Sequence, residues 1–239
     1  MSSYGVFLPS FEASVPVSPE LLRRIAVRAE ELGLAHLWVG DHLVWNVGMV
    51  SALPVLAHVA AVTHTIRLGT AVYLLPLRQP VIAAKDVAAI DVLSGGRLIL
   101  GVGVGGENPV EYAAAGVERN RRGARMEEAL TQLRSLLGQE GIELKGEFAS
   151  MPAVTLAPPP IQQPVPVWMG GRAQAVVERA AAMADGYFPV WISPRRYRQV
   201  VETVAERRGD LDGFAFALNI FTLVGDDREQ ARTLLASHM

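Results

Sequence analysis

Two segments place glycines directly after an apolar run, where larger side chains would cover the backbone. In the first, an apolar strand that begins at Arg97 runs into glycines at positions 101, 103, 105 and 106. Glycine has no Cβ, so such a strand end exposes backbone N–H groups and lets a flat ring or a phosphate approach closely. A purely packing role would favour Val or Ile at these positions. The spacing therefore predicts a ligand-facing strand end.

The second segment reads Val167-Trp-Met-Gly170-Gly171-Arg-Ala and leads into a helix expected over residues 174–184. A strand that ends in Gly-Gly and enters a helix presents unpaired N–H groups at the positive end of the helix dipole, which suits a phosphate. Phosphate sites after late strands are common in (β/α) barrels. The alternative interpretation is a simple tight turn between strand and helix.

An acid and a histidine follow the second expected strand, in the sequence Gly40-Asp41-His42. At the carboxyl end of a strand, where barrel active sites form, such a pair can transfer protons or hydrogen-bond the polar edge of a cofactor. In the alternative interpretation Asp41 caps a turn and His42 is a loop residue. Glu111 is the one acid after the fourth strand that we retain as a pocket residue.

Other site chemistries have little support in the sequence. Residues 101–106 formally satisfy GxGxxG, but they follow the fourth strand rather than the first, and Asn108-Pro109 disturbs the helix that should receive a pyrophosphate. His58 and His64 lack metal-ligand spacing, and no acidic cluster completes a metal shell. The chain has no cysteine, which excludes disulfides and a cysteine nucleophile. We predict no metal site.

Short apolar runs alternate with amphipathic helical stretches along the chain, as expected for parallel strands covered on both faces. Ser18-Pro19 and Ser193-Pro194 are typical helix starts, Gly33 ends the first helix, and further helices are expected at 122–137 and 226–236. Repeated β-then-α order favours a (β/α) barrel or a doubly wound open sheet. The expected strands are Tyr4–Leu8, His36–Val39, Ile66–Leu75, Arg97–Gly103, Pro166–Gly170, Gly186–Val190 and Phe214–Val224.

The 239 residues are interpreted as a single domain, 1–239. Residues 138–166 are rich in Gly and Pro, and we interpret them as a hairpin excursion outside the main sheet, because β-then-α order resumes directly after them. The seven expected core strands are one fewer than a closed barrel of this type requires. Either the hairpin region contributes a strand or the barrel is incomplete at its carboxyl-terminal end.

The composition limits the classes of partner. Half of the residues are apolar and 19% are charged, so the chain can bury a substantial core. A formal net charge of −2 gives no electrostatic reason to expect nucleic acid or an anionic membrane as a partner. The first residues lack the basic start and apolar run of a signal peptide, and no window approaches about 18 uninterrupted apolar residues. We expect a soluble, cytoplasmic protein.

Taken together, these residues resemble the bacterial luciferase-like monooxygenase family, and within it the deazaflavin-dependent oxidoreductases. The resemblance covers nearly the whole chain and depends on the order and spacing of several modest motifs. They are Ala29-Glu-Glu-Leu-Gly33, Leu37-Trp-Val-Gly-Asp-His42, Arg67-Leu-Gly-Thr-Ala-Val72, Asp91-Val-Leu-Ser-Gly-Gly-Arg-Leu-Ile-Leu-Gly-Val-Gly-Val-Gly105, Glu111-Tyr112, Arg125-Met-Glu-Glu128, Pro166-Val-Trp-Met-Gly-Gly171 and Ala184-Asp-Gly-Tyr187.

The resemblance implies an α/β, (β/α)8 TIM-barrel-like fold that binds FMN or coenzyme F-420 in the barrel mouth. It implies a non-proline cis peptide at Ala71–Val72, behind the ring of the cofactor. His42 and Asp41 match the catalytic pair near that ring, with His42 as the proton donor. The residues implied to contact the cofactor are Thr70, Ala71, Val72, Gly103, Val104, Gly105, Glu111, Met169, Gly170, Gly171, Arg172 and Ala173.

Three functions are compatible with these observations. The leading hypothesis is an F-420-dependent oxidoreductase that transfers hydride to or from a small organic substrate, with His42 as acid or base. The second is an FMN-dependent monooxygenase that receives reduced flavin from a partner reductase. The third is a flavin-binding protein without catalysis. The resemblance also implies a homodimer.

The chain departs from the family pattern at two points. Gly106 stands where relatives usually carry an aromatic residue, which we expect to widen that wall of the mouth. Full-length relatives have an eighth strand and helix beyond the last elements identified in this sequence.

Overall fold

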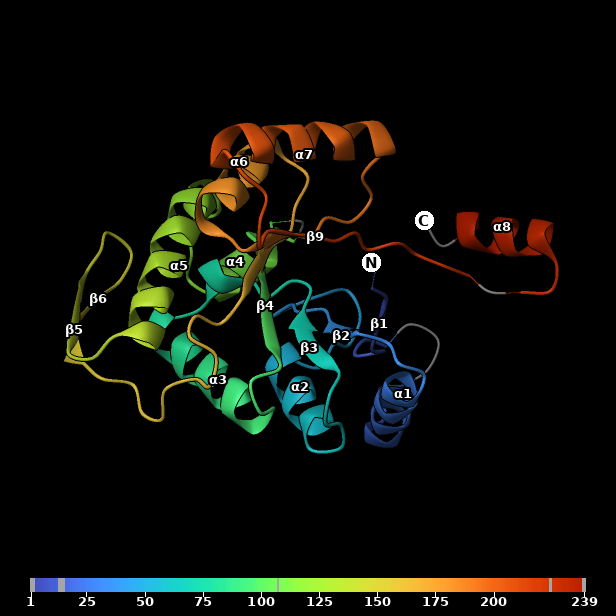
Figure 1. The fold of residues 1–239 in the computed structure, drawn as a ribbon, viewed down its shortest axis with the longest axis horizontal. Coiled ribbons are helices and arrows are strands. Elements are labelled where there is room, and N and C mark those ends of the chain that lie inside the picture. Colours follow the sequence, from blue (N-terminus) through green and yellow to red (C-terminus); the bar gives the residue numbers. More distant parts are fainter. Residues whose placement is uncertain (1–2, 13–15, 107, 224, 238–239) are drawn as a thin grey trace.

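The computed structural model describes residues 3–12, 16–106, 108–223 and 225–237. Strands and helices alternate through most of this range (Figure 1). The strands of the main sheet are β1 (Gly5–Phe7), β2 (His36–Val39), β3 (Arg67–Thr70), β4 (Leu98–Val102), β7 (Val167–Met169), β8 (Gly186–Tyr187) and β9 (Ala215–Phe216). The helices are α1 (Pro19–Glu31), α2 (Ala52–Ala60), α3 (Pro80–Leu93), α4 (Pro109–Ala114), α5 (Arg122–Gly138), α6 (Gln174–Met183), α7 (Pro194–Arg208) and α8 (Arg228–Ser237), with 3₁₀ turns η1 (Leu75–Leu77) and η2 (Arg119–Arg121).

The main sheet is parallel, with the strand order β1-β2-β3-β4-β7-β8-β9. The remaining strands, β5 (Ile142–Lys145) and β6 (Ser150–Val154), pair only with each other, as an antiparallel hairpin outside this sheet (Figure 1). The structure therefore confirms the seven core strands, and the β5–β6 hairpin lies within residues 138–166. Each new strand is added beside the previous one of the main sheet, which is the order of a TIM-barrel-like fold.

Every strand of the main sheet except β2 is shorter than the sequence predicted, and the third and the last differ most. The third was expected over 66–75, but β3 ends at Thr70, where the cis peptide Ala71–Val72 begins and η1 follows. This cis peptide confirms the expectation drawn from the resemblance. The last strand was expected over 214–224, but β9 is Ala215–Phe216, and Val224 lies outside the described residues. An apolar run alone does not separate a paired strand from an extended segment.

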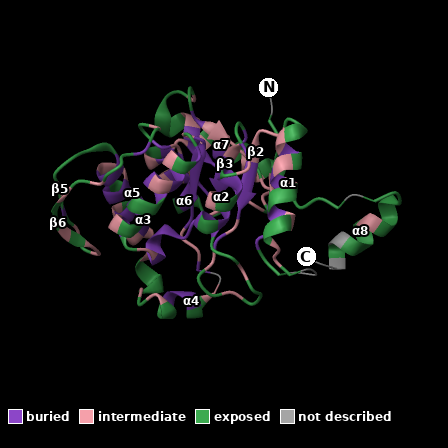
Figure 2. Cartoon of the chain, turned by 90° about the horizontal axis from the view of Figure 1, so that it is seen from below, coloured by how far each residue is buried: buried purple, intermediate pink, exposed green. Residues whose placement is uncertain are grey.

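Helices α1, α2, α3, α5, α6 and α7 cover the outer face of the sheet and bury a continuous core against it, whereas α8 lies apart from the sheet (Figure 2). The inner face of the sheet holds a separate aromatic cluster, in which Trp38, Ile99 and Phe188 are buried and Trp168 packs against them. Helix starts follow the expected capping, because Ser18 Oγ accepts the N–H of Leu21. No helix in the described part of the chain is long and apolar enough to cross a bilayer.

Glycines in β4 and after β7 are required by close packing against the end of β3. A Cβ on Gly101 would lie 1.9 Å from the carbonyl oxygen of Thr70, and one on Gly103 would lie 2.3 Å from Cγ2 of Val72. A Cβ on Gly170 would lie 2.6 Å from Cγ1 of the same Val72. Protein atoms therefore fill the space beside these three glycines. This corrects the expectation that the alternating glycines primarily open space for a ligand.

Two buried or half-buried charged side chains tie the helical layer to the sheet. The guanidinium of Arg97 donates to the carbonyls of Ala60, Thr63 and Ile66 at the end of α2 and the start of β3. The carboxylate of Glu30, in α1, accepts the backbone N–H groups of residues 64–66. Burial would raise the pKa of Glu30, but these N–H groups and the Thr65 hydroxyl outweigh it and lower the pKa to about 2.

We predict that Gly103→Ala lowers the free energy of unfolding by about 2 kcal/mol or more, because the new methyl group overlaps Val72. Val72→Ala removes the overlapping atom, so the double variant should lose less stability than the two single changes added together. Urea unfolding followed by circular dichroism measures this double-mutant cycle. Gly138→Ala is the control, because a Cβ there meets nothing within 4 Å. Additive losses at positions 72 and 103 would contradict the packing described.

We predict that Glu30→Gln is less stable than the original chain by about 1–2 kcal/mol at pH 7, after allowance for solvent screening. The folded-state pKa is depressed, so the carboxylate stabilises the fold fully only above its ordinary pKa near 4.5. The difference between the two proteins should therefore shrink as the pH falls from 4.5 towards 2. Urea unfolding at pH 7, 5.5, 4 and 3 tests this. A difference that is independent of pH would contradict it.

Candidate active site

The sequence-predicted residues meet at the carboxyl edge of the parallel sheet. Asp41 and His42 follow β2, the segment at 70–72 ends β3, residues 103–105 follow β4, and residues 170–173 follow β7. Because the strands of this sheet are parallel, their carboxyl ends lie at one edge, where (β/α) proteins bind their ligands.

His42 is held by a buried acid from another element. Its Nδ1 lies 3.2 Å from both carboxylate oxygens of Glu111. The Glu111 side chain is fully buried, and its Oε1 also accepts the N–H of Leu43 at 2.5 Å. The short helix α4 supplies Glu111, and Asn108 at its start donates a hydrogen bond to the carbonyl of Val44. The loop after β2 and the helix after β4 therefore fix the imidazole together.

One nitrogen of His42 remains available at the mouth. Nε2 has no hydrogen-bond partner among the described residues, and the side chain is about one-fifth exposed. The ring stacks on Trp45, with centroids 3.9 Å apart and planes inclined by 19°. An imidazole fixed at Nδ1 by a carboxylate and open at Nε2 can exchange a proton with a bound molecule.

Asp41 points into the protein instead. Its carboxylate is fully buried and accepts the N–H of Leu74 at 3.2 Å and a donor of Arg78 at 2.8 Å. Burial raises the pKa of Asp41, while the Arg78 charge acts in the opposite direction. The carboxylate of Asp41 is thus occupied by the segment after β3, whereas His42 keeps one nitrogen open at the mouth.

Two arginine side chains lie beside the loop that follows β4. Gly105 and Gly106 have φ values of +62° and +105°, which favour glycine. A Cβ on Gly106 would lie 3.2 Å from Nε of Arg122 and 3.5 Å from Nε of Arg119. Gly106 was expected to widen this wall, but the arginine side chains fill the space beside it. The carbonyl of Val104 accepts the hydroxyl of Tyr112, which anchors this loop to α4.

The segment after β7 passes directly into the start of α6. Gly171 adopts φ +141°, and its neighbour Val176 would lie 3.0 Å from a Cβ there, so α6 begins close against the turn. Among the described residues, no side chain accepts a hydrogen bond from the first N–H groups of α6. Arg172 and Ala173 are exposed, and the guanidinium of Arg172 lies 5.7 Å from the ring centre of Trp191.

The predicted cofactor residues divide into two groups. Thr70, Gly103, Met169 and Gly170 are buried, and the hydroxyl of Thr70 donates to the carbonyl of Gly101. Ala71, Val72, Val104, Gly105, Gly171, Arg172 and Ala173 are partly or fully exposed at the carboxyl edge. The second group has exposed surface that a ligand could contact. The first group lies beneath that surface. Glu111 is buried and contacts His42.

The sequence did not identify two contributors. Arg78 follows η1 and binds Asp41, and nothing in its local sequence distinguishes it from a surface arginine. Trp45 stacks on His42. The two residues are three positions apart in a loop, and such a spacing does not predict that their rings are in contact. No group of three or more His, Asp or Glu side chains suited to a metal ion occurs in the described ranges.

Two curated proteins are similar to this chain over most of its length. The F-420-dependent glucose-6-phosphate dehydrogenase of Kineococcus radiotolerans is 35% identical over 178 residues, covering 71% of this chain and 52% of the relative. The corresponding enzyme of Amycolatopsis mediterranei is also 35% identical, over 177 residues, 71% of this chain and 53% of the relative. The chain thus spans about half the length of these relatives.

Solved structures show the same fold at lower identity. The monooxygenase RslO1 from Streptomyces bottropensis superposes with a TM-score of 0.86 at 24% identity, covering 99% of this chain and 76% of that one. An F-420-dependent secondary alcohol dehydrogenase gives a TM-score of 0.84 at 22% identity, covering 98% and 73%. The model of the luciferase-like monooxygenase family matches residues 3–239, and the chain belongs to that family.

Proposed function

We propose that the protein is an F-420-dependent oxidoreductase that moves hydride to or from a small organic substrate at the carboxyl edge of the sheet. The observation that carries the proposal is His42, fixed at Nδ1 by buried Glu111 and open at Nε2. Oxidation of an alcohol by hydride transfer also releases one proton, and a fixed imidazole can accept it. The relatives at 35% identity named above are F-420-dependent dehydrogenases, which supports the same cofactor.

The residues present fit a flat cofactor that carries a phosphate. The uncapped start of α6 and the turn at Gly170-Gly171 offer backbone N–H groups to a phosphate. The guanidinium groups of Arg119 and Arg122 beside Gly106 favour further negative charge at the mouth. When bound, coenzyme F-420 supplies a hydride acceptor or donor. His42 would exchange the proton at Nε2, and Glu111 would keep the imidazole oriented.

An FMN-dependent monooxygenase is the second candidate. The fold is shared with RslO1 and with the FMN complex of a Baeyer–Villiger monooxygenase, which has a TM-score of 0.81 at 14% identity. In this case the partner would be a reductase that delivers reduced flavin. Dependence of turnover on oxygen would favour this candidate, and turnover with F-420 in the absence of oxygen would favour the first. A flavin-binding protein without catalysis would show cofactor binding without turnover.

We predict that His42→Ala lowers kcat by 10²-fold or more in F-420-linked oxidation, because the proton acceptor is lost. F-420 absorbance would be followed with a panel that includes glucose 6-phosphate and secondary alcohols. The affinity for F-420 should change less than threefold. His64→Ala is the control, because its side chain is exposed and lies at the opposite edge of the sheet. Equal kcat values for His42→Ala and the original chain would contradict the assigned role.

We predict that Glu111→Gln lowers kcat by about tenfold with little change in KM, because the amide can still contact the imidazole but no longer stabilises its charged form. Steady-state kinetics with the same panel measures kcat and KM separately. A change confined to KM would show that Glu111 acts in binding and not through His42.

A further inference from the structure

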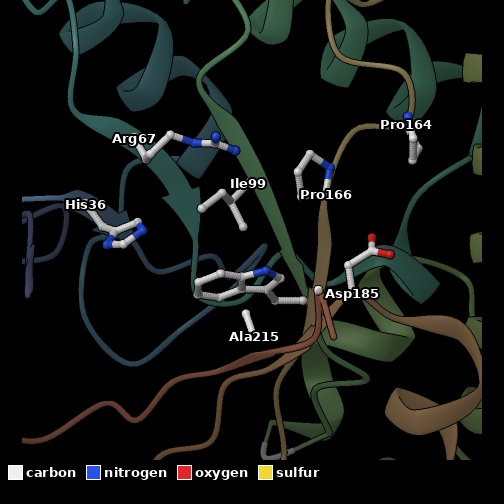
Figure 3. Close-up of a pocket in the computed structure, with 9 residues that line it drawn as sticks. His36, Arg67, Ile99, Pro164, Pro166, Asp185 and Ala215 are labelled. Carbon is white, nitrogen blue, oxygen red and sulfur yellow. The ribbon is translucent and has the colours of Figure 1, made fainter. Parts of the chain in front are cut away.

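A cavity lies at the opposite edge of the sheet from the candidate active site. It has a volume of about 360 Å³. His36 and Arg67 are the first residues of β2 and β3, Ala215 is the first residue of β9, and Asp185 directly precedes β8. Figure 3 shows these side chains around one space, with Ile99 and Pro166 between them. The cavity therefore opens at the amino ends of the strands.

The aromatic cluster of the inner face separates the two sites. Trp38 packs against Phe188 with ring centroids 4.5 Å apart, and against Trp168 at 5.3 Å. Trp168 is also part of the cavity wall, so the cluster forms the floor of this cavity. A molecule bound here would not overlap a molecule bound beside His42.

Arg67 lines the cavity, and its guanidinium has N–H donors that no described residue accepts. Its Nη2 donates to the carbonyl of Leu98 at 3.2 Å and to Oε1 of Gln162 at 3.0 Å. Its Nη1 has no hydrogen-bond partner among the described residues, and no carboxylate of those residues forms an ion pair with it. Its Nε is buried and out of reach from the cavity, so Nη1 is the donor that remains for a ligand, and it can donate to a carboxylate.

The other polar side chains that line the cavity, Asp185 and His36, are less suited to bind an anion. Asp185 already accepts from Arg134 at 2.9 Å and from the N–H of Val167 at 2.8 Å. His36 stacks on Trp38, and burial together with the Arg67 charge lowers its pKa. Both effects favour the uncharged imidazole, which can donate a single hydrogen bond. Arg67 is the cation with capacity left for an anionic ligand.

The rest of the lining is apolar and includes an indole. Ile99, Pro164, Pro166, Trp168 and Ala215 surround the space next to Arg67. Its volume lies at the lower end of the range for small-molecule pockets, which suits a ligand with one ring. We propose that this cavity binds a small aromatic carboxylate, with the carboxylate on Arg67 and the ring against Trp168. The site is independent of the proposed cofactor and of the proposed reaction.

Benzoate is the probe, and benzyl alcohol is the neutral control of similar shape. Isothermal titration of the original chain should give one benzoate site with Kd of about 1 mM or lower, and at least tenfold weaker binding of benzyl alcohol. Saturating F-420 or FMN should leave the benzoate Kd unchanged. Equal binding of the two probes, absence of benzoate binding, or displacement by a cofactor would each overturn the proposal.

Two variants locate the binding. Arg67→Met removes the charge, and Ala215→Leu fills the cavity without touching Arg67, so each should weaken benzoate binding at least tenfold. Arg24→Met removes an equivalent charge from an exposed position of α1 and should leave the Kd unchanged. Circular dichroism establishes that each variant is folded. Benzoate binding retained in a folded Arg67→Met or Ala215→Leu protein would overturn the proposal, and the titration of the original chain decides the outcome if either fails to fold.

Discussion

The packing of the Val72 side chain determines how the strands meet at the carboxyl edge of the sheet. It occupies the space that side chains at Gly103 and Gly170 would otherwise fill, so the end of β3 lies against both β4 and β7. The hydrogen bonds from the N–H of Tyr73 to the carbonyl of Gly101, and from the N–H of Gly103 to the carbonyl of Tyr73, hold the same region. Close packing of this kind tolerates almost no added volume. The primary role of these glycines is therefore to allow this close packing. The shape of the surface at the carboxyl edge follows from it.

The candidate active site depends on this arrangement through two contacts that cross between elements. Asp41 joins the end of β2 to the segment after β3, and Glu111 joins α4 to the loop that follows β2. Both carboxylates are fully buried, Glu111 accepting hydrogen bonds at both oxygens and Asp41 at Oδ2 only, so removal of either would leave buried donors without an acceptor. His42 lies between these two anchors with one nitrogen exposed. Acid–base catalysis requires a rigidly supported group with one position open to a proton, and the proposed role of His42 rests on this arrangement.

Much of this could be predicted from the sequence. The order of apolar runs and helix signals predicted the seven strands and the excursion, because parallel strands covered on both faces leave a clear pattern. The family resemblance predicted the Ala71–Val72 cis peptide and drew attention to Glu111. The sequence could not show that Asp41 turns inward to Arg78, or that Val72 fills the space beside the glycines. These contacts join residues about 30 to 100 positions apart, and residue types do not report which side chain occupies a shared space.

The cofactor is the central claim, and a parallel titration tests it most directly. The purified chain would be titrated with oxidised F-420 and with FMN, and binding would be followed by the fluorescence of each cofactor. The account predicts one F-420 site of micromolar affinity or tighter, and FMN binding at least tenfold weaker. Tighter binding of FMN, or binding of neither cofactor, would contradict it.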